Sequence, residues 1–219
     1  MKKMVSAFMA IAMVLSLTCS VFAKDSNVTP NALGTTTTHS WSYTYGNPKE
    51  ITKGAWQHFY TGHPAERDGE TDSPAHAVSY GHSYSGTFGG NIKNKIQIEF
   101  GISFSKEETF SITKNSAPLD KGEYIKAYYK KNYDSYDVTQ KDLQHTYGFA
   151  QSYPGGPYEK VDKYETVTSH VTVDKALQPK IKIEYWKDGK HVRSAGSESV
   201  LVRTEYYEFI DGEYRLVET

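Results

Sequence analysis

The residues best suited to metal chemistry lie in one stretch, "HFYTGHPAERDGETDSPAHAVSYGH", from position 58 to position 82. Imidazoles and carboxylates are the usual protein ligands of zinc and other transition metals. No two of these histidines have the H-x-H or H-x-x-x-H spacing that would place a pair on one strand or helix, and the H-E-x-x-H motif is missing. The stretch is therefore either a solvated surface loop or the metal site of a hydrolase. The candidate metal ligands are His58, His63, His76 and His82.

A possible nucleophile is Ser83 in "GHSYSGTFGG", which approaches the G-x-S-x-G motif of many hydrolases. The motif requires glycine two residues after the serine, where this chain has Ser85. It also requires a helix after the turn, and here a strand pattern follows. We therefore expect no catalytic serine. No phosphate-binding or dinucleotide-binding motif appears either, so the sequence favours a protein that is not an enzyme and that needs no cofactor.

A third group of residues is suited to binding rather than catalysis, in the stretch "YIKAYYKKNYDSY" that begins at position 124. In a strand, alternate side chains point to opposite faces. One face would carry Ile125, Ala127, Tyr129 and Tyr133, which suit a core. The other would combine flat rings with amines, a common binding surface that suits sugars and cell-wall polymers. The alternative is an ordinary outer face whose lysines prevent edge pairing. The candidate ligand-binding residues are Tyr124, Lys126, Tyr128 and Lys130.

The element with the clearest periodicity follows the histidine-rich stretch. Apolar residues alternate with polar residues or glycine, and the apolar positions are Ile96, Ile98, Phe100, Ile102 and Phe104. Strict alternation predicts a half-buried strand. Phe110 and Ile112 continue the pattern after a polar turn. We therefore expect a hairpin over residues 92–113.

This hairpin could instead enter a membrane, because a membrane-spanning strand needs about 9–11 residues with one apolar face. With its long alternating strand and Ser/Thr-rich turns, the segment resembles aerolysin-like β-pore-forming proteins. That resemblance implies a membrane-active, toxin-like protein that uses the 92–113 hairpin. However, Lys114 lies on the same face as Phe110 and Ile112, and a lysine facing lipid is costly. A soluble hairpin that covers a core is therefore the favoured interpretation.

Further strand patterns extend to the end of the chain, over residues 166–173, 181–185, 199–209 and 214–217. Asp-Gly pairs at 188–189 and 211–212 predict tight hairpin turns. Helical periodicity is weak and is limited to short helices considered at 49–60 and 141–149. The sequence thus predicts an all-β protein, an antiparallel two-sheet β-sandwich with long hairpins.

The N-terminus has the features of a secretory signal peptide: two lysines, a short apolar run and Val21-Phe22-Ala23 at its end. We expect cleavage after residue 23, a flexible polar lead-in over 24–40, and a single β-sandwich domain over 41–219. The single cysteine, Cys19, would leave with the signal peptide. The mature chain would then carry 23 Lys and Arg against 26 Asp and Glu, a net charge of −3. This balance gives no reason to expect a nucleic-acid partner.

The sequence predicts a secreted, extracellular protein that acts by binding a cell-surface or cell-wall component, with a glycan as the expected partner. A membrane is the second possible partner, through the 92–113 hairpin. A metal-dependent hydrolase built on the histidine-rich stretch is the third interpretation.

Overall fold

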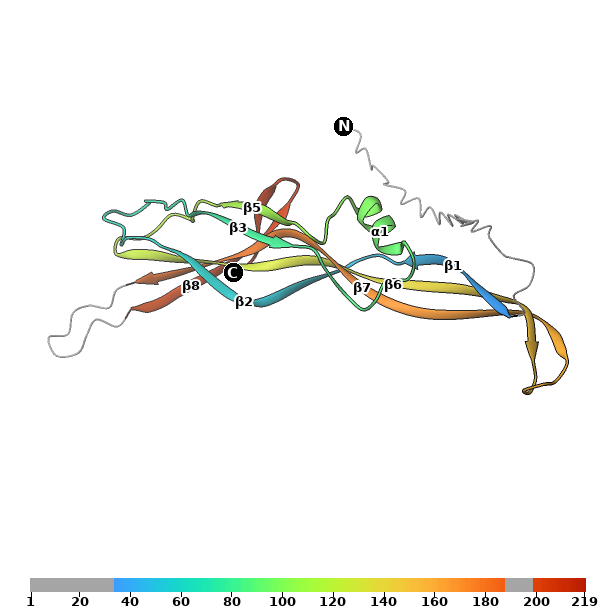
Figure 1. The fold of residues 1–219 in the computed structure, drawn as a ribbon. Coiled ribbons are helices and arrows are strands. Elements are labelled where there is room, and N and C mark those ends of the chain that lie inside the picture. The colour runs from blue at the N-terminus through green and yellow to red at the C-terminus, as the bar shows by residue number, and fades with distance from the viewer. Residues whose placement is uncertain (1–33, 188–198) are drawn as a thin grey trace, which may run out of the picture. The chain divides into compact units, whose positions relative to one another are not determined.

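The computed structural model describes residues 34–187 and 199–219 (Figure 1). The predicted signal peptide, residues 24–33 of the lead-in and the Asp188-Gly189 turn lie outside the described residues. Over these residues the protein is all-β, as predicted, with one helix. In chain order the elements are β1 (Thr35–Tyr45), β2 (Lys49–Thr61), β3 (Ala75–Gly81), β4 (Ser83–Ser85), α1 (Ile92–Phe100), β5 (Glu107–Thr113), β6 (Glu123–Gln151), β7 (Tyr158–Lys187), β8 (Val200–Ile210) and β9 (Glu213–Glu218).

The chain forms two compact units, and the long strands β6 and β7 contribute to both. The first unit contains residues up to Thr44 together with Thr139–Ser169. The second contains Tyr45–Val138 and His170–Thr219. Residues 35–40 belong to β1, so the predicted flexible lead-in is wrong for this part. The reason is that the threonines of β1 suit a strand, and this strand pairs with β6.

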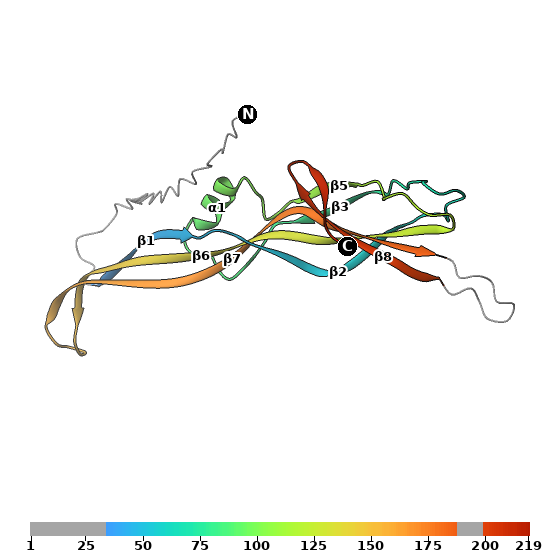
Figure 2. The ribbon, with the colours of Figure 1, turned by 180° about the vertical axis from the view of Figure 1, so that it is seen from behind.

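Strand pairing follows the order β1-β6-β7-β8-β9, with β2 added beside β6 and β4 beside β7. A second, two-stranded sheet is formed by β3 and β5, which pair antiparallel from Ala75 opposite Thr113 to Gly81 opposite Glu107. Figure 2 shows these pairings from behind. Sheet packed on sheet is the predicted sandwich arrangement, and it lies in the second unit.

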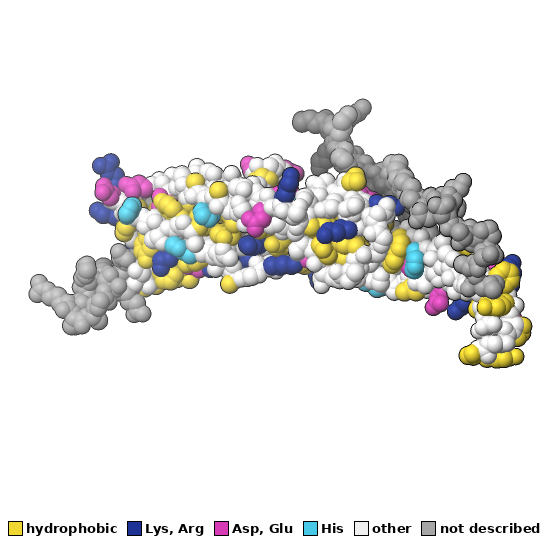
Figure 3. Space-filling view, viewed as in Figure 1, with side chains coloured by type: hydrophobic (Ala, Val, Ile, Leu, Met, Phe, Trp, Pro, Cys, Tyr) yellow, Lys and Arg dark blue, Asp and Glu magenta, His cyan; other side chains and the backbone are white. Residues whose placement is uncertain are grey.

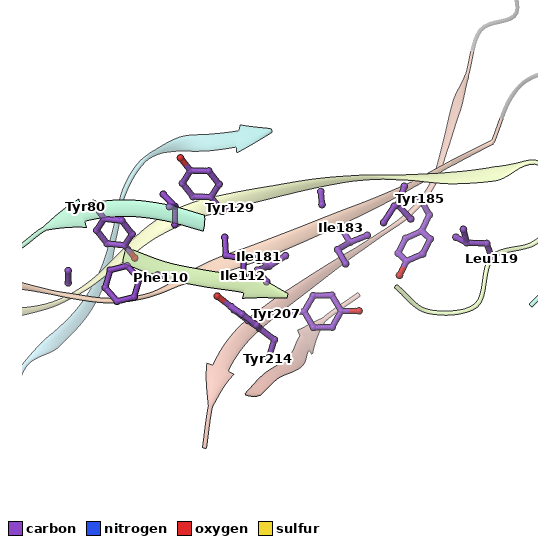
Figure 4. Close-up of a cluster of buried hydrophobic side chains, with 14 of the residues drawn as sticks. Tyr80, Phe110, Ile112, Leu119, Tyr129, Ile181, Ile183, Tyr185, Tyr207 and Tyr214 are labelled. Atoms are coloured by element: carbon purple, nitrogen blue, oxygen red, sulfur yellow. The ribbon is translucent and has the colours of Figure 1, made fainter. Parts of the chain in front are cut away.

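The core of the second unit lies between its two sheets (Figure 4). Along β6, the predicted inner face of Ile125, Ala127, Tyr129 and Tyr133 is buried, which confirms that prediction. The other sheet contributes Phe110 and Ile112 from β5 together with Val78 and Tyr80 from β3. The remaining contributions come mainly from β7, β8 and β9, through Ile181, Ile183, Tyr185, Tyr207 and Tyr214.

The predicted hairpin over 92–113 does not form, and this prediction is wrong. Residues 92–100 form the helix α1, and β5 pairs with β3 instead. Ile92 and Ile96 are fully buried at helical i, i+4 spacing, whereas Ile98 is 81% exposed. Gly101 ends the helix with a φ of 64°; its N–H donates to the carbonyl of Ile98, and the N–H of Ile102 donates to the carbonyl of Gln97. This left-handed position suits glycine. The membrane-inserting hairpin proposed from the sequence therefore has no counterpart in the structure.

The two short helices considered at 49–60 and 141–149 are also absent, since these residues lie in β2 and β6. Their polar and apolar residues fit both periods over a short window, and pairing between strands decides the outcome. None of the described helical residues forms a segment long and apolar enough to cross a membrane.

Several core tyrosines are expected to lower the free energy of unfolding as the pH becomes alkaline. Burial, with hydrogen bonding to Glu205, raises the pKa of Tyr185 to about 12, and burial raises the pKa of Tyr80, Tyr207 and Tyr214 above the ordinary value of 10. Because these folded-state pKa values are raised, their stabilising effect is complete below about pH 10 and is lost as the pH rises through the folded-state values. We expect the urea midpoint to fall steeply above about pH 10. Tyrosinate absorbance should rise with unfolding, and a midpoint constant up to about pH 12 would contradict this expectation.

Candidate functional site

The strongest candidate site is the outer face of the sheet in the second unit, opposite the core. Strand alternation leaves one row of half-buried side chains on each of the central strands β6, β7 and β8. The neighbouring strand β2 is aligned with β6 so that His58 lies opposite Tyr128. We call this surface the aromatic–lysine face. It consists of Trp56, His58, Tyr124, Tyr128, Trp186 and Tyr206 together with Lys126, Lys130, Lys182 and Glu184.

Lysine ammonium groups lie over the rings of this face. The Nζ atom of Lys126 is 4.2 Å from the ring centre of Trp186, and that of Lys182 is 4.2 Å from the ring centre of Tyr128. The Lys130 ammonium lies 5.9 Å from the ring of Trp56. These distances fall within the range of cation–π attraction. The lysine side chains thus lie against the aromatic rings and help to fix their positions.

Ring-to-ring contacts connect β2 to β6 and to β8. His58 meets Tyr128 edge-on with 5.3 Å between ring centres, and the ring centres of Trp56 and Tyr206 are 5.9 Å apart. The imidazole Nε2 of His58 also lies 2.8 Å from the hydroxyl of Thr61. Aromatic contacts at these separations stabilise a surface beyond the area that they bury. The face is therefore ordered before any ligand arrives.

Glu184 anchors the middle of the face. Its carboxylate pairs with Lys182 at 2.5 Å and accepts the indole N–H of Trp186 at 3.2 Å. Burial opposes its ionisation, but hydrogen bonds from Lys182 and Tyr128 outweigh burial and lower the pKa of Glu184. Burial and the same hydrogen bond raise the pKa of Tyr128 to about 12. Glu184 is therefore an acceptor that holds a lysine, an indole and a phenol together.

Lys126 and Lys130 differ from Lys182 in their ionic environment. Within the part of the chain that the structure describes, neither is paired with a carboxylate. Each carries three N–H donors, which can turn toward a ligand. Both were predicted from the sequence as ligand-binding residues, and the structure places both beside Tyr124 and Tyr128 on one face of β6.

The four histidines predicted as metal ligands are not brought together. His58 belongs to the aromatic–lysine face, and His63 is exposed in the loop after β2. His76 stacks on Phe59 with 5.2 Å between ring centres. His82 is buried, and its Nδ1 accepts the N–H of Ala176 at 2.9 Å. Among residues 34–187 and 199–219, no three His, Cys, Asp or Glu side chains are placed to hold a metal ion.

Within residues 34–187 and 199–219, no histidine forms a hydrogen bond with the Ser83 hydroxyl. This hydroxyl donates to Asp174 at 3.3 Å, and Asp174 is paired with Lys53 at 2.5 Å. The adjacent His82 is instead bound to Ala176 and, through Nε2, to Glu108 at 2.9 Å. A serine nucleophile needs a base within hydrogen-bond reach. The hydrogen bonds of Ser83 and His82 therefore connect parts of the fold and do not form a nucleophile–base pair.

Sequence reasoning missed five residues of the face that come from other strands, namely Trp56, Lys182, Glu184, Trp186 and Tyr206. One signal was available: the alternating pattern Lys182-x-Glu184-x-Trp186 begins in the strand predicted at 181–185. Trp56 gave none, because it lies in the segment 49–60 that was considered as a short helix. The proximity of these residues to Tyr128 depends on which strands become neighbours, and no local pattern encodes that.

Comparison with known proteins does not assign the chain to a family. No protein-family model matches the sequence, and no curated protein matches it. Among solved structures, the chain is similar to one described as "Crystal structure of Cry23Aa1 and Cry37Aa1 binary protein complex". The identity is 10%, the match covers 79% of this chain and 90% of that chain, and the TM-score is 0.30. A TM-score this low does not establish a shared fold.

Proposed function

We propose that the protein is an extracellular, non-enzymatic binding module that holds a cell-surface or cell-wall glycan on the aromatic–lysine face. The observation that carries this proposal is the convergence of two tryptophans and three tyrosines with lysine ammonium groups on one sheet face. Flat rings can stack on the apolar faces of sugar rings, and the ammonium groups of Lys126 and Lys130 can donate to sugar oxygens. The glycan is the partner that uses both features together.

The order already present in this face supports the same proposal. Rings held by lysine stems and by Glu184 lose little side-chain freedom when a ligand binds. The face also extends over four adjacent strands, which suits an extended polymer better than a small molecule.

Replacement of Trp186 by alanine tests the proposal directly. Trp186 lies beneath Lys126 and donates to Glu184, so its loss removes a stacking surface and frees both neighbours. We expect Trp186→Ala to weaken glycan retention by about tenfold or more, which is typical of a buried aromatic anchor. The measurement is binding to an array of cell-surface and cell-wall polysaccharides, followed by titration of the best ligand.

The matched control is Trp41→Ala. Trp41 is also a half-buried tryptophan, but it lies on β1 in the first unit. It should leave retention unchanged. Circular dichroism must show that both variants are folded. Equal retention by wild type and Trp186→Ala would remove this face from consideration, and failure of the wild type to bind any glycan would reject the proposed function.

A further inference from the structure

We propose that the turn joining β6 to β7 is a lipid-binding element that anchors the protein to the interfacial region of a membrane. With the end of β6 and the first residue of β7 included, this element covers residues 146–158; it belongs to the first unit and is separate from the aromatic–lysine face. Its sequence, "TYGFAQSYPGGPY", contains four aromatic residues and no charged residue. We call it the aromatic turn. Its role is independent of the glycan-binding proposal.

The aromatic side chains of this turn are exposed. Tyr153 is 62% exposed, and Tyr147, Phe149 and Tyr158 each have between 42% and 48% of their surface exposed. Figure 3 shows hydrophobic side chains gathered at this end of the hairpin. A contiguous exposed apolar group usually marks an interaction site. Here three of the four rings are phenols, which have an apolar body and a polar end.

Phenol rings of this kind are enriched at the boundary between lipid tails and water. The charged residues of the hairpin begin only beyond the turn, with Asp142 and His145 on β6 and Glu159 and Lys160 on β7. This order leaves the aromatic turn free to enter the headgroup region while the charges remain in water. A lipid surface therefore matches the chemistry along the hairpin.

The turn is ordered by its own contacts. Gly156 is buried against the ring of Tyr153, and a β-carbon at this glycine would lie 2.9 Å from the ring. The side chain of Gln151 donates to the carbonyl of Gly156 at 2.8 Å, and the N–H of Gly156 donates to the carbonyl of Tyr153 at 3.0 Å. The Tyr153 ring is therefore held in place against Gly156 while most of its surface stays exposed, and binding requires little further ordering.

The charges near the turn determine which lipid it should prefer. Residues 141–165 contain three lysines and four acidic residues, a net charge of −1. Lys160 and Lys163 each lie within 4 Å of an acidic side chain. A surface of this kind is not drawn to anionic lipid, which basic clusters recognise. Binding should therefore occur on zwitterionic vesicles and should depend little on salt.

The test is flotation of the processed protein, after removal of the predicted signal peptide, with vesicles of pure phosphatidylcholine. We expect the bound fraction to stay the same when phosphatidylglycerol is added to the vesicles, in low salt and in high salt. The double variant Phe149→Ser, Tyr153→Ser should reduce the bound fraction about tenfold. Tyr153→Trp should keep it, because indole is also an interfacial ring.

The matched control is Phe209→Ser with Val217→Ser, which removes two exposed apolar side chains from the second unit. It should float like the wild type. The proposal is overturned if the wild type does not float, if the aromatic-turn variant floats equally well, or if binding requires phosphatidylglycerol and disappears in high salt. None of these results bears on glycan retention, which is measured without lipid.

Discussion

Replacing Tyr185 by alanine should destabilise the protein by about 4 kcal/mol, the range found when a large buried ring is lost. Tyr185 on β7 is fully buried, and the Arg203 guanidinium lies 3.7 Å from its ring centre. Its hydroxyl donates to Glu205 at 2.5 Å and accepts the N–H of Ala117 at 2.8 Å. The variant would therefore lose packing and two hydrogen bonds together. Urea unfolding followed by circular dichroism measures the change.

Tyr185→Phe separates the two contributions. It keeps the ring but leaves the Ala117 N–H and part of the Glu205 carboxylate unsatisfied, although Tyr207 still donates to Glu205 at 2.5 Å. A loss of about 1–3 kcal/mol is expected. Tyr153→Ala, at an exposed position, should change stability by no more than about 0.5 kcal/mol. If Tyr185→Ala were no worse than Tyr185→Phe, packing around this ring would not be the dominant contribution.

Replacing Lys53 by methionine should cost about 3 kcal/mol, because it leaves a buried carboxylate without its counter-charge. Asp174 is buried, and the Lys53 ammonium lies 2.5 Å from its Oδ2. Ser83 donates to the same oxygen, while Oδ1 has no hydrogen-bond partner within the described residues. The Lys53 side chain is 43% exposed, so the effect should lie at the lower end of the range for buried pairs. The urea midpoint measures it.

Two variants serve as controls for this prediction. Lys160→Met breaks the pair of Lys160 with Asp162, in which both side chains are exposed, and should cost no more than about 0.5 kcal/mol. The double variant Lys53→Met, Asp174→Asn removes both charges and should recover most of the loss. Similar effects of Lys53→Met and Lys160→Met would show that the Asp174 carboxylate is hydrated in the folded protein.

Several features of the fold could be read directly from local patterns. The alternation around Ile125, Ala127 and Tyr129 predicted a buried face, and that face is in the core. The Asp211-Gly212 pair predicted a tight turn, and it joins β8 to β9 with positive φ angles of 53° and 88°. Both succeed because the signal depends only on neighbours in the chain: side-chain alternation in one case and backbone freedom in the other.

The segment 92–104 shows where local patterns fail. Its isoleucines fit a period of two, yet Ile92 and Ile96 also fit a helical face. The tertiary structure favours the helix because β5 pairs with β3 and leaves residues 92–100 no strand partner. The glycines at 89, 90 and 101 were local boundary signals that supported this result.

The sequence by itself determined the class of fold, the inner and outer faces of β6, and four of the residues on the candidate binding face. The tertiary structure alone decided that Trp56, Lys182, Trp186 and Tyr206 would join them, and that the four histidines would remain apart. The physical reason is that strand alternation is encoded within a few residues. The neighbours of a strand are chosen by burial and pairing between segments more than 50 residues apart, as with Trp186 and Lys126.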